Sequence, residues 1–150
     1  PAEPLFRSQI LEVKSFEHLI CTEQLSRRLG FKVGEELIRV VRVRSLNGNA
    51  RQVDHGYFLE SIAKGLTPEI AAKSIYDYLE HKRGVKVMAS RRTVSVELAN
   101  DEDCSYLDLG KYNCVAVMES QSYTSDGILF EVTHARTHPE IFHYRVNSKR

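Results

Sequence analysis

The stretch ELIRVVRVRSLNGNARQVDHGYFL, residues 36–59, decides the fold that we expect for this chain of 150 residues. Residues 36–45 alternate in a way that suits a strand and not a helix, because side chains two apart in a strand point to the same face. Asn47-Gly48 follows, and this dipeptide is typical of the two-residue turn of a β-hairpin. Residues 51–59 then return as the second strand. The stretch predicts two neighbouring antiparallel strands.

Further strands and short helices are expected on both sides of this hairpin. Before it, residues 8–13 predict a strand and residues 22–29 a helix. After it, residues 67–84 predict a helical stretch opened by Thr67-Pro68, within which Ser74 is a candidate start of a second helix. The remaining expected elements are strands over residues 85–98, 114–123, 128–136 and 141–146, a helix over residues 101–109, and a turn at Asp126-Gly127.

Strands joined by tight turns, with few helices between them, indicate an α+β fold: an antiparallel sheet with flanking helices and not a doubly wound parallel sheet. A single domain over residues 1–150 is the expected organisation, since a chain of this length can bury a sizeable core. No internal repeat, linker or biased tract divides the sequence.

Charge and hydropathy exclude several classes of protein. The formal net charge is +1, and Lys and Arg are spread along the chain without forming the basic stripe of a duplex-binding surface. We therefore expect this segment not to hold DNA by itself. No apolar run approaches the ~20 residues that span a bilayer, and residues 1–4 lack the layout of a signal peptide, so a cytoplasmic location is expected. A start at Pro1 without methionine predicts a fragment of a longer protein.

Signatures of catalysis and of metal binding are weak in this sequence. It has no G-x-S-x-G elbow, phosphate-binding glycine loop or H-E-x-x-H motif. Cys21, Cys104 and Cys114 are odd in number and widely spaced, which fits neither a disulfide framework nor a zinc site. His134 and His138 come nearest to a metal-ligand pattern, but partly exposed histidines without a metal are the commoner interpretation. We expect no catalytic residues, metal or cofactor.

Arg42 and Arg44 continue the face of the first long strand that also carries Ile38 and Val40. An arginine on an apolar face needs an anionic partner, because an unpaired buried charge is costly. Two adjacent guanidinium groups form a fork that suits a phosphate or a carboxylate. The alternative is that the opposite face of the strand is buried, which would leave both arginines in solvent or paired with nearby acids.

Two other positions are candidates for the same site. Ser74, at an expected helix start, offers its hydroxyl and the free N–H groups of Ile75 and Tyr76 to an anion, with an ordinary helix cap as the alternative. Glu131 lies in a strand, where its carboxylate could accept hydrogen bonds from sugar hydroxyls or form a structural ion pair with an arginine.

Four segments of the chain occur in a familiar order and approximate spacing: Arg42-Val43-Arg44, residues 74–79 before a glycine, Ser122-Tyr123 through Asp126-Gly127, and Phe130-Glu131. From about Ser8 onward the chain resembles the UTRA effector domain, the C-terminal half of GntR-type regulators of the HutC subfamily. The resemblance implies a chorismate-lyase-like α+β fold and homodimers. It also implies a preceding winged helix-turn-helix domain, absent from residues 1–150, through which the full-length protein would bind DNA.

The resemblance assigns roles to the five candidate residues. In relatives that bind amino-sugar phosphates, the positions that match Arg42, Ser74 and Tyr76 hold the phosphate, and those that match Arg44 and Glu131 reach the sugar. The function that this implies is the ligand-sensing domain of a bacterial transcriptional repressor, in which a sugar phosphate modulates DNA binding. The alternative is a chorismate-lyase-like enzyme acting on a small carboxylate.

Local segments refine the resemblance. Residues 53–58 and 106–109 look most like trehalose-operon repressors, whose effector is trehalose 6-phosphate. Two positions depart from the family pattern. Thr137 stands where amino-sugar relatives have a tyrosine, and Ser15-Phe16 lies closer to Arg42 than the early Ser-Phe segment of the family does.

Overall fold

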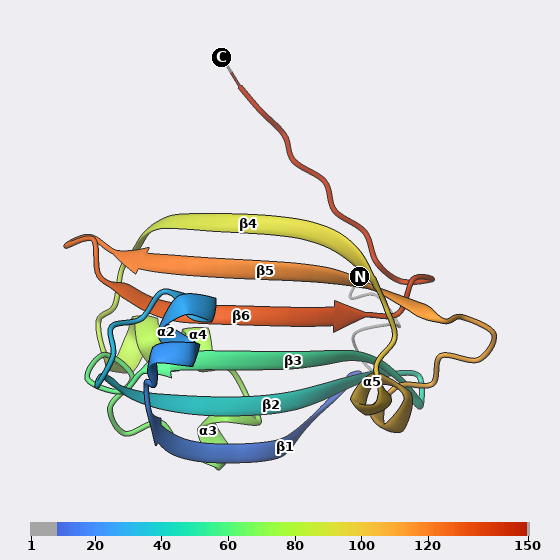
Figure 1. Cartoon of the computed structure of the whole chain (residues 1–150), viewed down its shortest axis with the longest axis horizontal. Helices are drawn as coiled ribbons and strands as arrows, with labels where there is room; N and C mark the ends of the chain where they lie inside the picture. Colours follow the sequence, from blue (N-terminus) through green and yellow to red (C-terminus); the bar gives the residue numbers. More distant parts are fainter. Residues whose placement is uncertain (1–8, 150) are drawn as a thin grey trace.

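The computed structural model describes residues 9–149 and contains a six-stranded antiparallel sheet with strand order β1-β2-β3-β6-β5-β4 (Figure 1). The strands are β1 (Gln9–Ile20), β2 (Glu36–Leu46), β3 (Asn49–Leu59), β4 (Val87–Leu98), β5 (Cys114–Thr124) and β6 (Leu129–Thr137). The helical elements are α2 (Glu23–Leu29), α3 (Pro68–Ala71), α4 (Ile75–Asp77), the π-helical turn η1 (Tyr78–Lys82) and α5 (Asp101–Tyr106). The predicted α+β class is confirmed.

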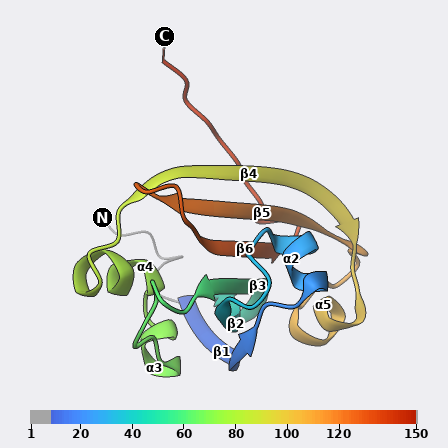
Figure 2. The same cartoon turned by 60° about the vertical axis from the view of Figure 1, so that its left-hand side comes forward.

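Helices lie on both sides of the sheet. Figure 2 shows α3 and α4 on one side and α2 and α5 on the other. Because successive side chains of a strand point to opposite faces, each strand contributes to both sides. In β3, Gln52 and Asp54 face the side of α3 and α4, whereas His55 and Tyr57 face the side of α2 and α5.

The β2–β3 hairpin has the predicted turn. Asn47 and Gly48 have φ values of 51° and 82°, the pair of left-handed conformations that a type I′ turn requires. A bulge between Arg44 and Ser45 shifts the pairing, so that Arg44 lies opposite Gln52 and Ser45 opposite Ala50. The bulge therefore places Arg42 opposite Asp54.

The β5–β6 hairpin also turns where Asp126-Gly127 predicted. Thr124 closes the turn, because its hydroxyl oxygen accepts from the N–H groups of Asp126 and Ile128. The resulting register places Glu131 opposite Ser122 on β5 and opposite Phe58 on β3. Glu131 therefore lies on an inner strand of the sheet, with β5 between it and the edge strand β4.

Apolar side chains fill both faces of the sheet. The larger cluster includes Leu29, Phe31, Leu37, Phe58, Phe130 and Val132. The smaller cluster joins strand residues to the segment that follows α5, and comprises Val41, Val43, Val53, Leu107, Leu109, Val115 and Val117. Strand β2 is buried on both faces, since the adjacent residues Val40 and Val41 point to opposite faces and both are buried. Among the described residues, no helix is long and apolar enough to cross a membrane.

The predicted last strand is wrong. Residues 141–146 form no strand, and the chain beyond β6 extends away from the sheet (Figure 1). Strand β6 already pairs with β3 on one side and β5 on the other, so no free edge lies beside the chain where it leaves β6. Ile141, Tyr144 and Val146 consequently remain exposed.

Three predicted boundaries are corrected as well. Strand β1 continues to Ile20 instead of ending at residue 13, because a shift in register between Val13 and Ser15 lets it pair with the full length of β2. Ser8, its predicted first residue, lies outside the described residues. The stretch over residues 67–84 is divided into α3, α4 and η1, with the predicted second start at Ser74 confirmed. Helix α5 ends at Tyr106, three residues before the predicted 109.

Candidate ligand-binding site

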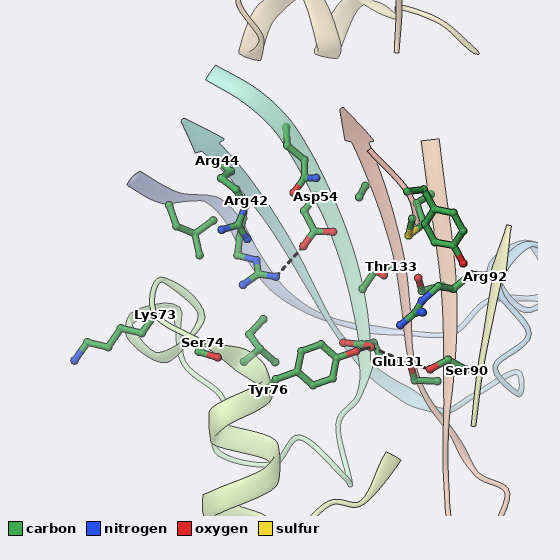
Figure 3. A pocket seen from close by; sticks show the side chains of 18 residues that line it. Arg42, Arg44, Asp54, Lys73, Ser74, Tyr76, Ser90, Arg92, Glu131 and Thr133 are labelled. Atoms are coloured by element: carbon green, nitrogen blue, oxygen red, sulfur yellow. Dashed lines mark hydrogen bonds and ion pairs between the residues drawn. The ribbon is translucent and has the colours of Figure 1, made fainter. Parts of the chain in front are cut away.

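A cavity of about 600 Å³ lies on the side of the sheet where α3 and α4 are found (Figure 3). Its lining includes all five predicted residues: Arg42, Arg44, Ser74, Tyr76 and Glu131. Strands β2, β3, β5 and β6 form its floor, and the segment of residues 73–76 forms a wall. The structure therefore brings together side chains that are separated by up to 89 positions in the sequence.

Arg42 is held in place by two contacts. Its Nη2 donates to Asp54 Oδ2 at 2.8 Å, and its Nη1 donates to the carbonyl oxygen of Ala71 at 3.3 Å. Only 13% of the Arg42 side chain and 15% of the Asp54 side chain are exposed, so this ion pair is largely shielded from water. The sequence left two interpretations open, and the one in which the arginine pairs with a nearby acid is correct for Arg42. Strand β2 is nevertheless buried on both faces, which neither interpretation included.

Arg44 is less compensated than Arg42. Within residues 9–149 it forms no hydrogen bond or ion pair. Burial lowers the pKa of Arg44, the positive charge of Arg42 lowers it further, and Asp54 partly opposes both effects. A bound anion would relieve this repulsion between the two guanidinium groups.

Glu131 is almost fully buried, with 2% of its surface exposed. Its Oε1 accepts from Tyr76 Oη at 2.6 Å and from Ser122 Oγ at 3.2 Å. Burial raises the pKa of Glu131, and the hydrogen bonds from Tyr76 and Ser122 lower it in part. Burial and the adjacent carboxylate likewise raise the pKa of Tyr76. The tyrosine extends from α4 across the cavity to this acid (Figure 3). Because both bonds fall on Oε1, Oε2 is the oxygen left to accept from a ligand.

Ser74 acts as the cap of α4 in this structure. Its Oγ accepts from the N–H group of Asp77 at 3.2 Å, which is the ordinary role that the sequence offered as the alternative. The hydroxyl proton is still available as a donor, since the capping bond uses only an oxygen lone pair. Ser74 also lines the cavity, so capping and ligand contact are compatible.

Three charged residues of the cavity were absent from the predicted set: Asp54, Lys73 and Arg92. The regular pairing that follows a two-residue turn would place Arg42 opposite Val53, and only the bulge moves it to Asp54. Arg92 lies on β4 and points into the cavity (Figure 3). Its position depends on pairing with β5 and, through β5, with β6, which no local pattern specifies.

The positions that depart from the family pattern, Thr137 and Ser15-Phe16, lie outside this cavity, and so do the three cysteines. Thr137 is buried and accepts a hydrogen bond from Gln52 at 2.9 Å. Cys21, Cys104 and Cys114 are free thiols. Within residues 9–149, no three His, Cys, Asp or Glu side chains gather in the way that a metal ion requires. His134 instead lies 3.3 Å from Glu119.

Replacing Glu131 with glutamine is expected to change how stability depends on pH. The pKa of Glu131 is raised in the folded protein, so the folded state holds this proton to a higher pH than the unfolded chain does. The free energy of unfolding should therefore fall as pH rises from about the ordinary glutamate pKa of 4.5 through the raised value. The Glu131→Gln variant should lack this decrease in the free energy of unfolding, because glutamine has no proton to lose in this pH range. Urea unfolding of both proteins across that range measures it, and parallel curves would contradict the expectation.

The fold and the charged cavity together define a small-molecule-binding α+β domain. The family described as the UTRA domain matches residues 8–143, and the chain belongs to this family. The chain is an effector-binding domain of the kind found in transcriptional regulators of the TreR/GntR type, and its fold is chorismate-lyase-like, as the resemblance implied.

Two relatives from Bacillus subtilis (strain 168) illustrate this membership. The HTH-type transcriptional regulator TreR is 28% identical over 123 residues, which are 82% of this chain and 52% of that protein. The HTH-type transcriptional repressor NagR is 23% identical over 116 residues, which are 77% of this chain and 47% of that protein. The chain thus spans about half the length of these relatives.

Solved structures agree with the sequence relatives. The effector-binding domain of the B. subtilis trehalose repressor TreR superposes with a TM-score of 0.87 at 26% identity, covering 94% of this chain and 98% of that one. The effector domain of PhnF from Mycobacterium smegmatis shares the fold alone, with a TM-score of 0.81 at 15% identity over 95% of this chain and 88% of that one.

Proposed function

We propose that this domain senses a sugar phosphate, which binds in the cavity of about 600 Å³. The charge of the cavity is the observation that supports this proposal most strongly. Its lining has four cationic side chains, Arg42, Arg44, Lys73 and Arg92, and two acidic ones, Asp54 and Glu131. The excess of two positive charges matches a phosphate monoester, which bears about −1.5 to −2 charges at pH 7.

The proposed contacts divide the cavity into two parts. Arg42, Ser74 and Tyr76 hold the phosphate, and Arg44 and Glu131 reach the sugar. Asp54 and Ala71 use two of the N–H groups of Arg42, and the remaining groups can still donate to phosphate oxygens. Oε2 of Glu131 accepts from sugar hydroxyls, for which a buried carboxylate is well suited.

The effector that we propose is trehalose 6-phosphate. Its support is the similarity to TreR, the trehalose repressor, in sequence and in structure. At 100 times its dissociation constant, a ligand stabilises the folded state by about 2.7 kcal/mol. Thermal unfolding should therefore show a clear rise in melting temperature with trehalose 6-phosphate and a far smaller one with trehalose. Equal shifts with the two sugars would show that the phosphate is not recognised.

The proposal extends to the whole regulator. Residues 1–150 form a single domain of a longer protein, which binds DNA through a winged-helix domain N-terminal to it. Binding of the sugar phosphate shifts the protein between states that differ in affinity for DNA, for which a coupling of ~1–3 kcal/mol is sufficient. The curated relatives that match are transcriptional regulators, and we propose a non-enzymatic, cytoplasmic role for this chain as well.

We expect the domain to form a homodimer through β4. This edge strand is exposed along its whole length, including Val94, Val96 and Leu98, and an unpaired strand edge favours association with a second copy. Light scattering at tens of micromolar should report a dimer, and Val96→Lys should shift it toward monomer. Ile20→Lys is the matched control, because Ile20 is exposed on the opposite edge strand β1. A monomeric wild-type domain would contradict this assembly.

A further inference from the structure

A second cavity, of about 520 Å³, lies on the opposite side of the sheet from the proposed sugar-phosphate site. It is found between α2 and α5, which share one side of the sheet (Figure 2). Arg28 from α2, Arg39 from β2 and Tyr57 from β3 line the end near α2. Glu97 and Glu102 line the end near α5. None of these residues lines the first cavity.

Hydrogen-bond donors converge at the α2 end of this cavity. The Tyr57 hydroxyl oxygen accepts from Arg28 Nη2 at 3.1 Å and from Arg39 Nε at 3.2 Å. A phenol also has a proton to donate, and within residues 9–149 the Tyr57 hydroxyl has no acceptor. Tyr57 is only 5% exposed, so neighbouring residues hold its ring in place. Three donor groups therefore meet here, and among the described residues the Tyr57 hydroxyl is the one that has no acceptor.

Two guanidinium groups are held close together here. Arg28 and Arg39 each lie 5.9 Å from the centre of the Tyr57 ring. Arg39 has a carboxylate partner, Glu17, at 3.1 Å, whereas Arg28 has none among the described residues. Their mutual repulsion is therefore only partly compensated, and an anion between them would be stabilised by both charges.

The α5 end of the cavity has the opposite character. Glu97 pairs with Arg136 at 2.9 Å, and Glu102 lies 2.6 Å from His55 Nε2. These acids would repel a second anionic group on a ligand that fills the cavity. The geometry therefore suits a ligand with one anionic group at the α2 end and neutral or donor groups at the α5 end.

We propose that this cavity is a second ligand site, which binds a small organic monoanion through its carboxylate, held by Arg28, Arg39 and the Tyr57 hydroxyl. The site is independent of the sugar-phosphate site, because the two cavities open on opposite faces of the sheet and share no lining residue.

Acetate is the probe that tests this site, with acetamide as its uncharged counterpart. The Arg39 Nε–H group is hydrogen-bonded to Tyr57, so its NMR signal reports directly on the cavity. At constant pH and ionic strength, acetate should shift this signal to saturation, and acetamide should not. Arg28→Gln should weaken acetate binding about tenfold, since a charge-assisted hydrogen bond is lost. Tyr57→Phe, which keeps the ring but not the hydroxyl, should weaken it also.

Two control variants separate this site from other effects. Arg27→Gln removes the same charge from an exposed neighbouring position on α2 that lines neither cavity, and it should bind acetate as the wild type does. Arg42→Ala disables the proposed sugar-phosphate site and should also keep the Arg39 shift. The proposal is overturned by a shift that never saturates, one that acetamide reproduces, one unchanged in Arg28→Gln, or one that disappears in Arg42→Ala.

Discussion

The Arg42→Ala variant is expected to lose most of the thermal stabilisation that trehalose 6-phosphate gives to the wild-type domain. Two effects act in the same direction. The variant lacks the guanidinium N–H groups proposed to hold the phosphate, and it leaves the Asp54 carboxylate, only 15% exposed, without its partner at 2.8 Å. An uncompensated carboxylate at this place repels the incoming phosphate. Of a wild-type gain of about 2.7 kcal/mol at 100 times the dissociation constant, little should remain.

Related variants test why Arg42→Ala loses the ligand-induced stabilisation. Arg42→Lys should restore part of the ligand-induced shift, because lysine keeps the charge that faces Asp54 but not the planar fork. Glu131→Ala should weaken discrimination among sugars more than it weakens binding of inorganic phosphate. Arg27→Ala, on the other side of the sheet, should leave the shift intact. If Arg42→Ala retained the full shift, other cations would have to hold the phosphate, with Arg92 of the same cavity the next residue to test.

The Asp103→Ala variant should be the most destabilising of the substitutions considered. Asp103 is fully buried and accepts three hydrogen bonds from Arg136, at 2.9, 3.1 and 2.9 Å. These bonds raise the pKa of Arg136 above its ordinary value. The arginine stays charged when its partner is removed, because the ordinary pKa of arginine already lies far above neutral pH. Breaking one side of such a buried pair typically costs about 3–5 kcal/mol. Asp103 also completes the capping box of α5 with Asn100, which adds to the loss.

Urea unfolding measures this effect, and Glu97 supplies the control. Glu97 pairs with the same Arg136 at 2.9 Å, but 51% of its side chain is exposed. Glu97→Gln should therefore cost no more than about 1 kcal/mol. Equal destabilisation by the two substitutions would mean that burial of Asp103 is not the reason for its importance.

The hairpins and the arginine fork could be predicted from the sequence because their determinants are local. Asn47-Gly48 and Asp126-Gly127 specify turns within two residues. Alternation alone placed Arg42 and Arg44 on one strand face, and both line the cavity. The helix start and the strand pattern made Ser74 and Glu131 candidates, and the resemblance to UTRA domains assigned roles to them together with Tyr76. The structure brings these three together with the arginines.

Features that depend on distant pairing could not be predicted in this way. The bulge that brings Asp54 to Arg42 leaves no distinct signal in the sequence, and Arg92 reaches the cavity only through the pairing of β4 with β5. At residues 141–146 the error is the opposite one, because the sequence predicts a strand that does not form. A strand needs a free edge to pair with, and β6 has two neighbours already. The second cavity was also missed, since its residues come from both flanking helices and four strands.

The alternating side chains of β3 have a practical consequence for protein engineering. Positions 52 and 54 belong to one cavity, and positions 55 and 57 belong to the other. A library that randomises only the even positions would select new recognition on one face while the other face stays constant, and a library at the odd positions would do the opposite. One strand thereby offers two orthogonal sets of positions, so a biosensor built on this domain could be retuned for one input without redesign of the other.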